Sequence, residues 1–198
     1  MKVIGIVGLP GSGKSAAADV AADLGIPVVT MGDVVRAECR DRGLELTEDN
    51  MGAVASDLRE RDGLAAVAKR SLPLIEERLA ESDAETLLVD GIRGGREVDR
   101  FREAFDDAFT LVTIEVPFET RLVRVRERGR DPTAEERADL RERDERELGY
   151  GMGEAMDDAD VTIRNTDSLD AFRAKIRALL ETGGAGPGQE QSLQETGS

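Results

Sequence analysis

The feature that most constrains this chain is an eight-residue run near its start, Gly8-Leu9-Pro10-Gly11-Ser12-Gly13-Lys14-Ser15. It fits the pattern Gly-x-x-x-x-Gly-Lys-Ser/Thr in full. Glycines at these spacings let the backbone wrap so that successive N–H groups point at one anion. The run follows the β-branched segment 3–7 and precedes helical apolar spacing over 14–24. We therefore expect a strand, a tight anion-binding loop and a helix, in that order.

The chemistry of this loop points to a nucleotide. The helix that follows presents the positive end of its dipole to the bound charge. Lys14 can reach the β- and γ-phosphates, and the Ser15 hydroxyl can ligate Mg²⁺. The alternative is a glycine-rich turn with no function, but the strand and helix on either side favour a site for ATP with Mg²⁺.

The rest of the chain alternates short apolar runs with helical patterns. Five runs are predicted as strands: 3–7, 27–30, 86–89, 110–116 and 161–163. Helical patterns cover 14–24, 32–82 with breaks near Gly43 and Gly63, 95–106, 118–128, 134–148, and a last helix that Ser168 would cap. Such alternation predicts an α/β fold, with a five-stranded parallel sheet covered by helices on both faces.

A carboxylate stands where the third predicted strand ends. Asp90 follows Leu87-Leu88-Val89, and open parallel sheets bind ligands beyond the carboxyl ends of their strands. Asp90 there could hold Mg²⁺ through water, together with Ser15. The alternative is a polar residue that only terminates the strand.

Two arginines are candidates for contact with the phosphoryl acceptor. Gly32-Asp33-Val34-Val35-Arg36 follows the second strand, and Asp90-Gly91-Ile92-Arg93 follows the third. Arg36 and Arg93 should reach the same sheet edge, where guanidinium groups could clamp an anionic acceptor. Asp33 could orient an acceptor hydroxyl, or it could cap the following helix. Both interpretations of Asp33 stay open.

These segments resemble nucleoside monophosphate kinases of the P-loop nucleoside-triphosphate hydrolase fold. Adenylate kinases carry Thr-Gly-Asp-x-x-Arg after the second strand and Asp-Gly-Phe-Pro-Arg after the third. Here Met31 replaces the threonine, and Ile92 alone stands for the Phe-Pro step. The resemblance implies that Arg36 and Arg93 contact the acceptor phosphate. The two departures imply an acceptor other than adenine, which need not be a nucleobase.

A third arginine-rich region resembles the short lid of a nucleotide kinase. Arginines recur from Arg121 to Arg146, around Asp131-Pro132. By resemblance, Arg126 and Arg130, nearest the loop, would stabilise charge on the transferred group as the lid closes. The alternative is a solvated helix pair, in which Glu142 pairs with Arg146 and Arg143 with Glu147, each four residues on.

Across residues 1–181 the chain is similar to an archaeal P-loop family that is related to adenylate kinase and has no assigned function. Besides the phosphate loop, the resemblance rests on Asp90-Gly91-Ile92-Arg93-Gly94 and on the segments 142–154 and 159–165. The last segment is also similar to the end of dephospho-coenzyme-A kinases. The family implies ATP binding and leaves the substrate open.

Three parts of the chain follow from this comparison. Residues 1–182 would form one kinase-like domain, with an acceptor-binding region at 32–82 and a lid at 126–150. The tail 183–198 is rich in Gly, Gln, Glu and Ser and should not order itself. The glycines of 149–153 favour a helix end followed by a turn over a flexible loop near the lid.

Composition excludes several classes of function. With 27 basic and 42 acidic residues the net charge is −15, which disfavours nucleic acid and anionic membranes as partners. One cysteine fits a reducing cytoplasm, and the absence of histidine excludes histidine catalysis. No run of the sequence is long and apolar enough to be a signal peptide or a membrane span. The basic residues are nearly all arginine, with lysine only at 2, 14, 69 and 175. We favour a halophilic cytoplasm, where hydrated carboxylates keep a protein soluble, over GC-rich codon bias as the cause of this composition.

Two functions remain. The first is a kinase that moves the γ-phosphoryl group of ATP to a small anionic metabolite, with Lys14, Arg126 and Arg130 in catalysis. The second is a nucleotide-dependent switch or slow ATPase with a macromolecular partner. The sequence leaves the acceptor, the choice of ATP or GTP, and the oligomeric state open.

Overall fold

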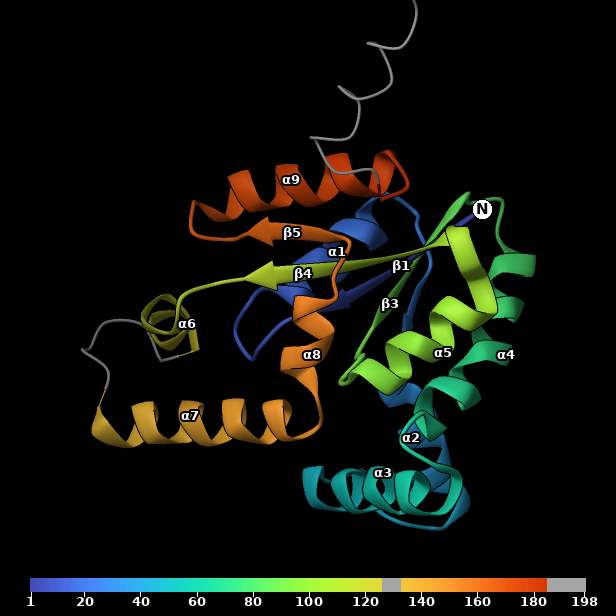
Figure 1. Cartoon of the computed structure of the whole chain (residues 1–198), viewed down its shortest axis with the longest axis horizontal. Helices are drawn as coiled ribbons and strands as arrows, with labels where there is room; N and C mark the ends of the chain where they lie inside the picture. The colour runs from blue at the N-terminus through green and yellow to red at the C-terminus, as the bar shows by residue number, and fades with distance from the viewer. Residues whose placement is uncertain (126–132, 185–198) are drawn as a thin grey trace, which may run out of the picture.

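A five-stranded parallel sheet forms the centre of the computed structural model, which describes residues 1–125 and 133–184 (Figure 1). The strand order is β2-β3-β1-β4-β5, and every neighbouring pair is parallel. The strands are β1 (Lys2–Val7), β2 (Val28–Thr30), β3 (Thr86–Asp90), β4 (Phe109–Glu115) and β5 (Val161–Arg164). The α/β fold and all five predicted strands are confirmed.

Helices connect the strands and cover both faces of the sheet (Figure 1). The helices are α1 (Lys14–Asp23), α2 (Met31–Asp41), α3 (Glu48–Asp62), α4 (Ala66–Glu81), α5 (Gly95–Phe105), α6 (Phe118–Val125), α7 (Ala134–Gly149), α8 (Met152–Asp157) and α9 (Leu169–Glu181). A short 3-10 turn, Asp106–Ala108, leads into β4. The breaks predicted near Gly43 and Gly63 separate α2, α3 and α4.

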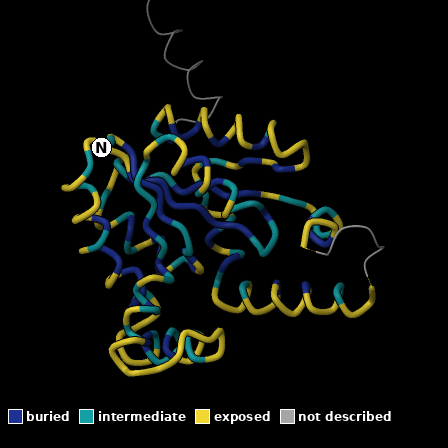
Figure 2. The backbone as a smooth tube through the Cα atoms, turned by 180° about the vertical axis from the view of Figure 1, so that it is seen from behind, coloured by how far each residue is buried: buried dark blue, intermediate teal, exposed yellow. Residues whose placement is uncertain are grey.

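The two faces of β1 belong to two different cores. Val3 and Val7 pack with the buried side chains of α2, α3, α4, α5 and α8. Ile4 and Ile6 pack with those of α1 and α9 on the other face. Successive side chains of a strand point to opposite faces of the sheet. Because helices cover both faces, both sets are buried. Figure 2 shows the result, with the strands buried and the outer faces of the helices exposed.

The carboxyl ends of the strands meet at one edge, and that edge is where the predicted site residues gather. Asp90 lies opposite Ile6 of β1 and opposite Thr30 of β2. The phosphate loop leaves β1 just beyond this point. Helices α6 and α7 lie past the tips of β4 and β5, so they border the same edge (Figure 1).

The structure differs from the sequence-based predictions at three places. Asp33 is not a helix cap, because α2 begins two residues earlier and Thr30 takes the capping position. The short helix α8 was not predicted. Gly183 and Gly184, which the sequence assigned to the tail, close the end of α9 instead, since their amides donate to Leu180 O and Leu179 O at 3.2 and 2.9 Å.

Other local predictions hold. The Ser168 hydroxyl accepts from the Ala171 amide at 3.2 Å and caps α9. Helix α7 ends at Gly149, and Gly151 follows with φ 94°. This is the helix end and turn that the glycines favoured. Within the residues described, no helix is long and apolar enough to cross a membrane.

Candidate functional site

Side chains donate hydrogen bonds to three carbonyl groups of the phosphate loop. The Lys14 ammonium donates to Gly8 O at 2.5 Å, and the Asn165 amide donates to Ser12 O at 2.8 Å. Arg121 Nη1 donates to Pro10 O at 3.0 Å. In a trans peptide the next N–H points away from the carbonyl. The amides that follow Pro10 and Ser12 therefore face the opposite side of the loop, where a phosphate would bind.

Gly13 shows why the loop needs glycine. It precedes α1 with φ 111°, a conformation that L side chains rarely adopt. A Cβ at this position would also lie 2.6 Å from the Asn165 amide nitrogen. A side chain would thus displace the residue that holds Ser12 O, so the glycine fixes both the loop and its support.

Lys14 lies in an environment of mixed charge. Burial lowers the pKa of its ammonium group, and the carboxylates of Asp90 and Glu147 partly oppose that shift. The guanidinium groups of Arg93 and Arg121 add to the lowering. Four charged groups, from β3, α6, α7 and the loop after β3, therefore act on Lys14 of α1.

The site fits a magnesium–nucleotide. Asp90 Oδ1 is buried and, among the described residues, has no hydrogen-bond partner. The buried hydroxyl of Ser12 is also without a partner there. A buried carboxylate oxygen without a partner is costly, and a cation with its water shell would satisfy it. Ser15, exposed at the first turn of α1, could supply the second oxygen.

Both predicted acceptor arginines lie at this edge, and each is paired with a carboxylate. Arg36 contacts Asp33 one turn earlier in α2. Arg93, in the loop between β3 and α5, contacts Glu147 near the end of α7. This second pair overturns one predicted contact. Glu147 does not pair with Arg143 on a solvated face, because the helix turns it inward to Arg93.

Arg121 has a different role from a mobile lid residue. Its guanidinium group forms two bonds to Asp144 of α7, at 2.7 and 2.6 Å, and the two side chains are 4% and 12% exposed. Because it also donates to Pro10 O, it joins α6, α7 and the phosphate loop.

The predicted lid residues Arg126 and Arg130 lie outside the described residues. Glu142 and Arg146 do form the predicted surface pair, at 3.3 Å.

A second buried carboxylate supports the acceptor side. Glu97 of α5, only 2% exposed, accepts from Arg59 of α3 at 3.2 Å and from the Arg93 amide at 2.8 Å. Burial raises the pKa of Glu97, and the Arg59 charge opposes this. The Arg59 guanidinium also lies 5.2 Å from the centre of the Tyr150 ring. Glu97 thus fixes the backbone that carries Arg93.

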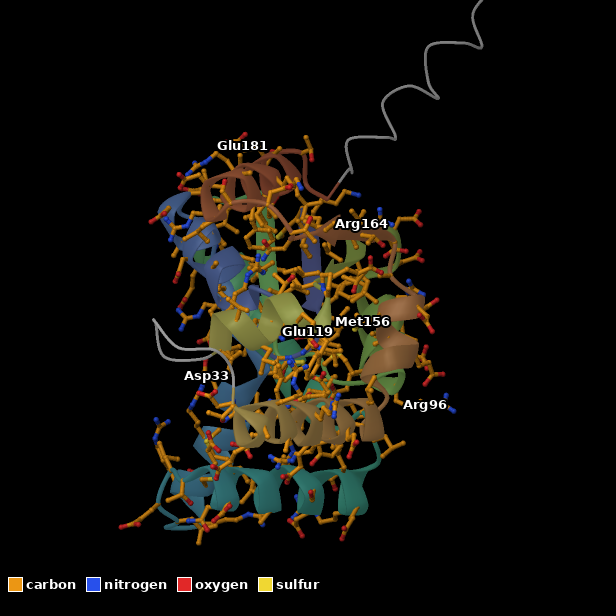
Figure 3. The ribbon with its side chains drawn as sticks, turned by 90° about the vertical axis from the view of Figure 1, so that its left-hand side faces the viewer. Asp33, Arg96, Glu119, Met156, Arg164 and Glu181 are labelled. Carbon is orange, nitrogen blue, oxygen red and sulfur yellow. The ribbon has the colours of Figure 1, made fainter. Side chains whose placement is uncertain are left out.

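The sequence reasoning missed Asn165, Glu97, Asp144 and Glu147. Asp144 and Glu147 belong to the segment 142–154, and Asn165 ends the segment 159–165, both of which carried the family resemblance. Their roles were hidden because charged residues surround them in the sequence. Figure 3 looks toward this side of the molecule, where side chains fill the space between α7 and the strands.

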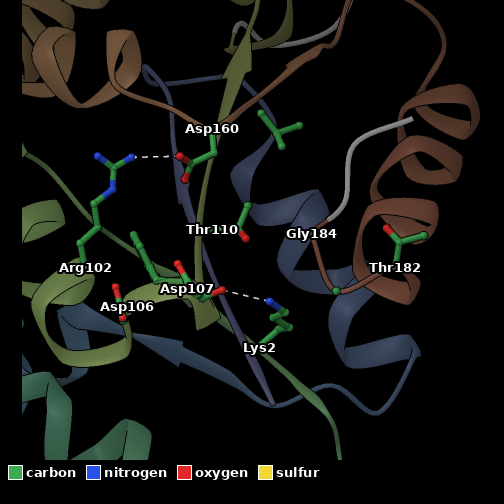
Figure 4. A pocket seen from close by; sticks show the side chains of 11 residues that line it. Lys2, Arg102, Asp106, Asp107, Thr110, Asp160, Thr182 and Gly184 are labelled. Atoms are coloured by element: carbon green, nitrogen blue, oxygen red, sulfur yellow. Dashed lines mark hydrogen bonds and ion pairs between the residues drawn. The ribbon is translucent and has the colours of Figure 1, made fainter. Parts of the chain in front are cut away.

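A hollow of about 500 Å³ at the opposite edge of the sheet does not fit this chemistry (Figure 4). It lies where β1, β4 and β5 begin, and its lining includes Lys2, Arg102 and Asp160. The Lys2 ammonium donates to Asp107 O at 3.0 Å, and Arg102 bonds to Asp160 at 3.1 Å. Parallel sheets bind ligands at the other edge, so we place the site at the phosphate loop.

Comparison with known proteins identifies the family of the chain. Residues 7–139 match the family model described as an AAA domain. A UPF0200 protein of Halobacterium salinarum is 54% identical over 180 residues, which are 91% of this chain and 93% of that protein. A UPF0200/UPF0201 protein of Archaeoglobus fulgidus is 53% identical over 180 residues, and the match spans 91% of this chain but 55% of that protein.

Two solved structures share the fold. The protein TT1252 from Thermus thermophilus has a TM-score of 0.61 and 21% identity, with 91% of this chain and 97% of that chain covered. A gluconokinase from Sinorhizobium meliloti 1021 has a TM-score of 0.51 and 17% identity, with coverage of 91% and 92%. At these identities the likeness concerns the fold.

Proposed function

Because this chain belongs to the UPF0200 family and carries an AAA-type P-loop domain, we propose that it is an ATP-dependent phosphotransferase acting on a small anionic metabolite. One observation carries the proposal. Lys14, Arg121 and Asn165 donate to carbonyl oxygens of the phosphate loop. Arg93, on the acceptor side, acts on the pKa of the same Lys14. A simple ATPase would not need that second cation.

The chain's residues divide the work by charge. The loop amides and Lys14 would bind the phosphates, and Ser15 with Asp90 would hold Mg²⁺, which neutralises charge on the transferred group. Arg36 and Arg93 would position the acceptor by bidentate bonds. Arg126 and Arg130 would stabilise charge in the transition state as a lid over 126–150 closes. The acceptor region would be 32–82, within a domain 1–182 that works in the cytoplasm.

A second function keeps the same nucleotide site. The arginines on the acceptor side already have carboxylate partners, as Arg36 has with Asp33 and Arg93 with Glu147. That arrangement also suits a slow ATPase that acts as a switch on a macromolecular partner. The net charge of −15 makes a protein a better partner than RNA.

Production of ADP separates the two functions. ADP is measured with and without a panel of nucleoside monophosphates and dephospho-coenzyme A. Turnover that depends on an acceptor supports the phosphotransferase. Slow turnover that ignores every acceptor and rises with added cell protein supports the switch.

Arginine variants then test the acceptor side. Arg36→Ala and Arg93→Ala should each reduce kcat/KM for the acceptor by about ten-fold or more, since each removes a charge-assisted hydrogen bond. Arg96→Ala is a matched control, because Arg96 is 74% exposed and its one ion pair among the described residues is with Asp99 of its own helix. An unchanged kcat/KM in both test variants would remove these residues from the site.

A further inference from the structure

Helix α7 has one inward face, and that face carries two carboxylates. Leu140, Asp144 and Glu147 are four and three residues apart, so they share one side of the helix. Leu140 and Asp144 are buried, and the Glu147 side chain is 16% exposed. Most of the rest of α7 is exposed, as Figure 2 shows. The inward face therefore carries two acidic groups, Asp144 in contact with Arg121 and Glu147 in contact with Arg93.

The ends of this segment are fixed on either side of Glu147. On one side Arg121 joins Asp144 to Pro10 O. On the other side the backbone of Gly151 packs against Gly94, in the loop that follows β3. The contacts on either side of Glu147 are therefore made to the phosphate loop and to the loop that follows β3.

The two oxygens of Glu147 have different surroundings. Oε1 contacts the Arg93 guanidinium group, while Oε2 is buried and has no hydrogen-bond partner among the residues described. The carboxylate is also near enough to Lys14 to act on its pKa. A buried acceptor oxygen without a donor is unfavourable unless a ligand supplies the donor.

The charge of this region decides which ligand fits. Arg36, Arg59 and Arg93 are each paired with a carboxylate, namely Asp33, Glu97 and Glu147. An anionic group of the acceptor could still bind Arg36 or Arg93, but Glu147 would repel a phosphate placed next to its free oxygen. A hydroxyl group has the opposite requirement, because it needs an acceptor for its hydrogen.

We propose that the group which receives the phosphoryl is a hydroxyl, and that Glu147 Oε2 accepts its hydrogen bond and takes its proton. The hydroxyl oxygen bonds to the γ-phosphorus of ATP. The bond from that phosphorus to the bridging oxygen breaks, and its electron pair leaves with ADP. The products are a phosphate monoester, ADP and one proton on Glu147. This inference rests on the phosphotransferase activity proposed above.

The opposite role for Glu147 is a latch. A carboxylate on Arg93 could stand in for the phosphate of the acceptor and leave when that phosphate binds. The two roles predict opposite effects of removing the charge. Without a base, kcat falls, whereas without a latch the acceptor binds more tightly.

The decisive experiment combines one variant with identification of the product. Wild-type protein, Glu147→Gln and Glu142→Gln are given ATP and Mg²⁺ with nucleosides, nucleoside monophosphates or dephospho-coenzyme A. ³¹P NMR then shows whether the new product is a phosphate ester or a phosphoanhydride. Glutamine keeps the shape and an oxygen for Arg93. Glu142 is the matched control, because its side chain on the same helix is 74% exposed.

We expect an ester product, a kcat lower by about 100-fold in Glu147→Gln, and wild-type kcat in Glu142→Gln. ATP binding, measured by calorimetry, should be as tight in Glu147→Gln as in the wild type or tighter, since a negative charge near the phosphates is gone. Intact ATP binding and an unchanged melting temperature would show that the variant is folded.

Four outcomes would overturn the inference, and they differ in what else they overturn. A phosphoanhydride product, or an ester formed at wild-type kcat by Glu147→Gln, contradicts the hydroxyl–Glu147 pair and leaves the phosphotransferase standing. Tighter acceptor binding in Glu147→Gln, with no loss of kcat, identifies the latch. If ATP binds but no acceptor gains a phosphoryl group, the proposed function itself fails.

Discussion

Lys14 combines two demands that oppose each other. It must be charged to bind phosphate, yet it is buried enough that its pKa lies below the ordinary 10.5. The carboxylates of Asp90 and Glu147 keep the charged form stable in the absence of nucleotide. Those carboxylates also repel a triphosphate, so Mg²⁺ at Asp90 and a proton donor at Glu147 would both favour nucleotide binding.

The lowered pKa of Lys14 predicts a pH dependence of binding. Only the protonated form attracts phosphate, so the Kd for ATP should rise by about ten-fold per pH unit once the pH exceeds this pKa. The loss should begin below 10.5, because burial has lowered the pKa of the folded protein. Calorimetry with Mg²⁺ from pH 7 upward measures it.

Lys14→Arg is the control for this titration. Arginine stays protonated over the whole range, so the Kd of this variant for ATP should not change with pH, even if the variant binds ATP more weakly than the wild type. A wild-type Kd that rises no earlier than expected for a free lysine would contradict the burial argument.

At the scale of elements, a buried ion pair joins α6 to α7, within the segment 126–150 that is proposed as a lid. Arg121 and Asp144 are 23 positions apart and meet as a buried ion pair. Removing one partner of such a pair leaves an uncompensated charge in a dry environment. Separating α7 from α6 at Asp144 would therefore be costly.

Breaking the pair predicts a large loss of stability. Asp144→Ala should reduce the free energy of unfolding by about 3–5 kcal/mol, because the Arg121 charge stays buried without its partner. Replacing both residues, as in Arg121→Met with Asp144→Leu, should recover much of the loss. Urea unfolding of the three proteins tests both expectations, and equal stability of the single variant and the wild type would refute them.

The approach of the loop after β3 to the corner between α7 and α8 gives a second prediction. Gly94 has an ordinary extended backbone, but a Cβ there would collide with the Tyr150 carbonyl oxygen. Gly94→Ala should therefore push α7 and α8 outward and lower both the melting temperature and the ATP affinity.

Gly149 provides the comparison. It ends α7, and a Cβ there would meet no atom within 4 Å. Gly149→Ala should leave stability unchanged or raise it by up to about 1 kcal/mol. If Gly94→Ala and Gly149→Ala had the same melting temperature, the close backbone contact would not matter.

At the scale of the whole molecule, the charge distribution is strongly acidic. The chain carries 42 acidic and 27 basic residues, and many of its ion pairs lie on exposed surfaces. Exposed pairs contribute little stability each, while the excess of 15 negative charges opposes the compact state. This balance links the stability of the fold to the salt of its surroundings.

We predict that the melting temperature rises steeply between low and molar KCl. Salt screens the repulsion among carboxylates that the folded state brings together. Differential scanning calorimetry measures the rise, and sucrose serves as a control that is excluded from protein surfaces but does not screen charge. A melting temperature that responds equally to both would remove the halophilic interpretation.

The sequence by itself determined the fold class and the five strands, and it predicted the nucleotide side of the site. Short β-branched runs alternating with helical patterns give a parallel sheet, because only that arrangement buries both faces of each strand. The loop from Gly8 to Ser15 carries its chemistry in consecutive residues. Asp90 could be placed because parallel strands end at one edge.

Only the tertiary structure decided the inward face of α7. Its sequence is charged on every side, so no pattern distinguishes Glu147 from its neighbours. Its partner Arg93 is 54 positions away, and Asp144 turns inward because Arg121 meets it from α6. A charged side chain can be buried only where a partner of opposite charge lies next to it. Packing between segments that are distant in the sequence decides where that is.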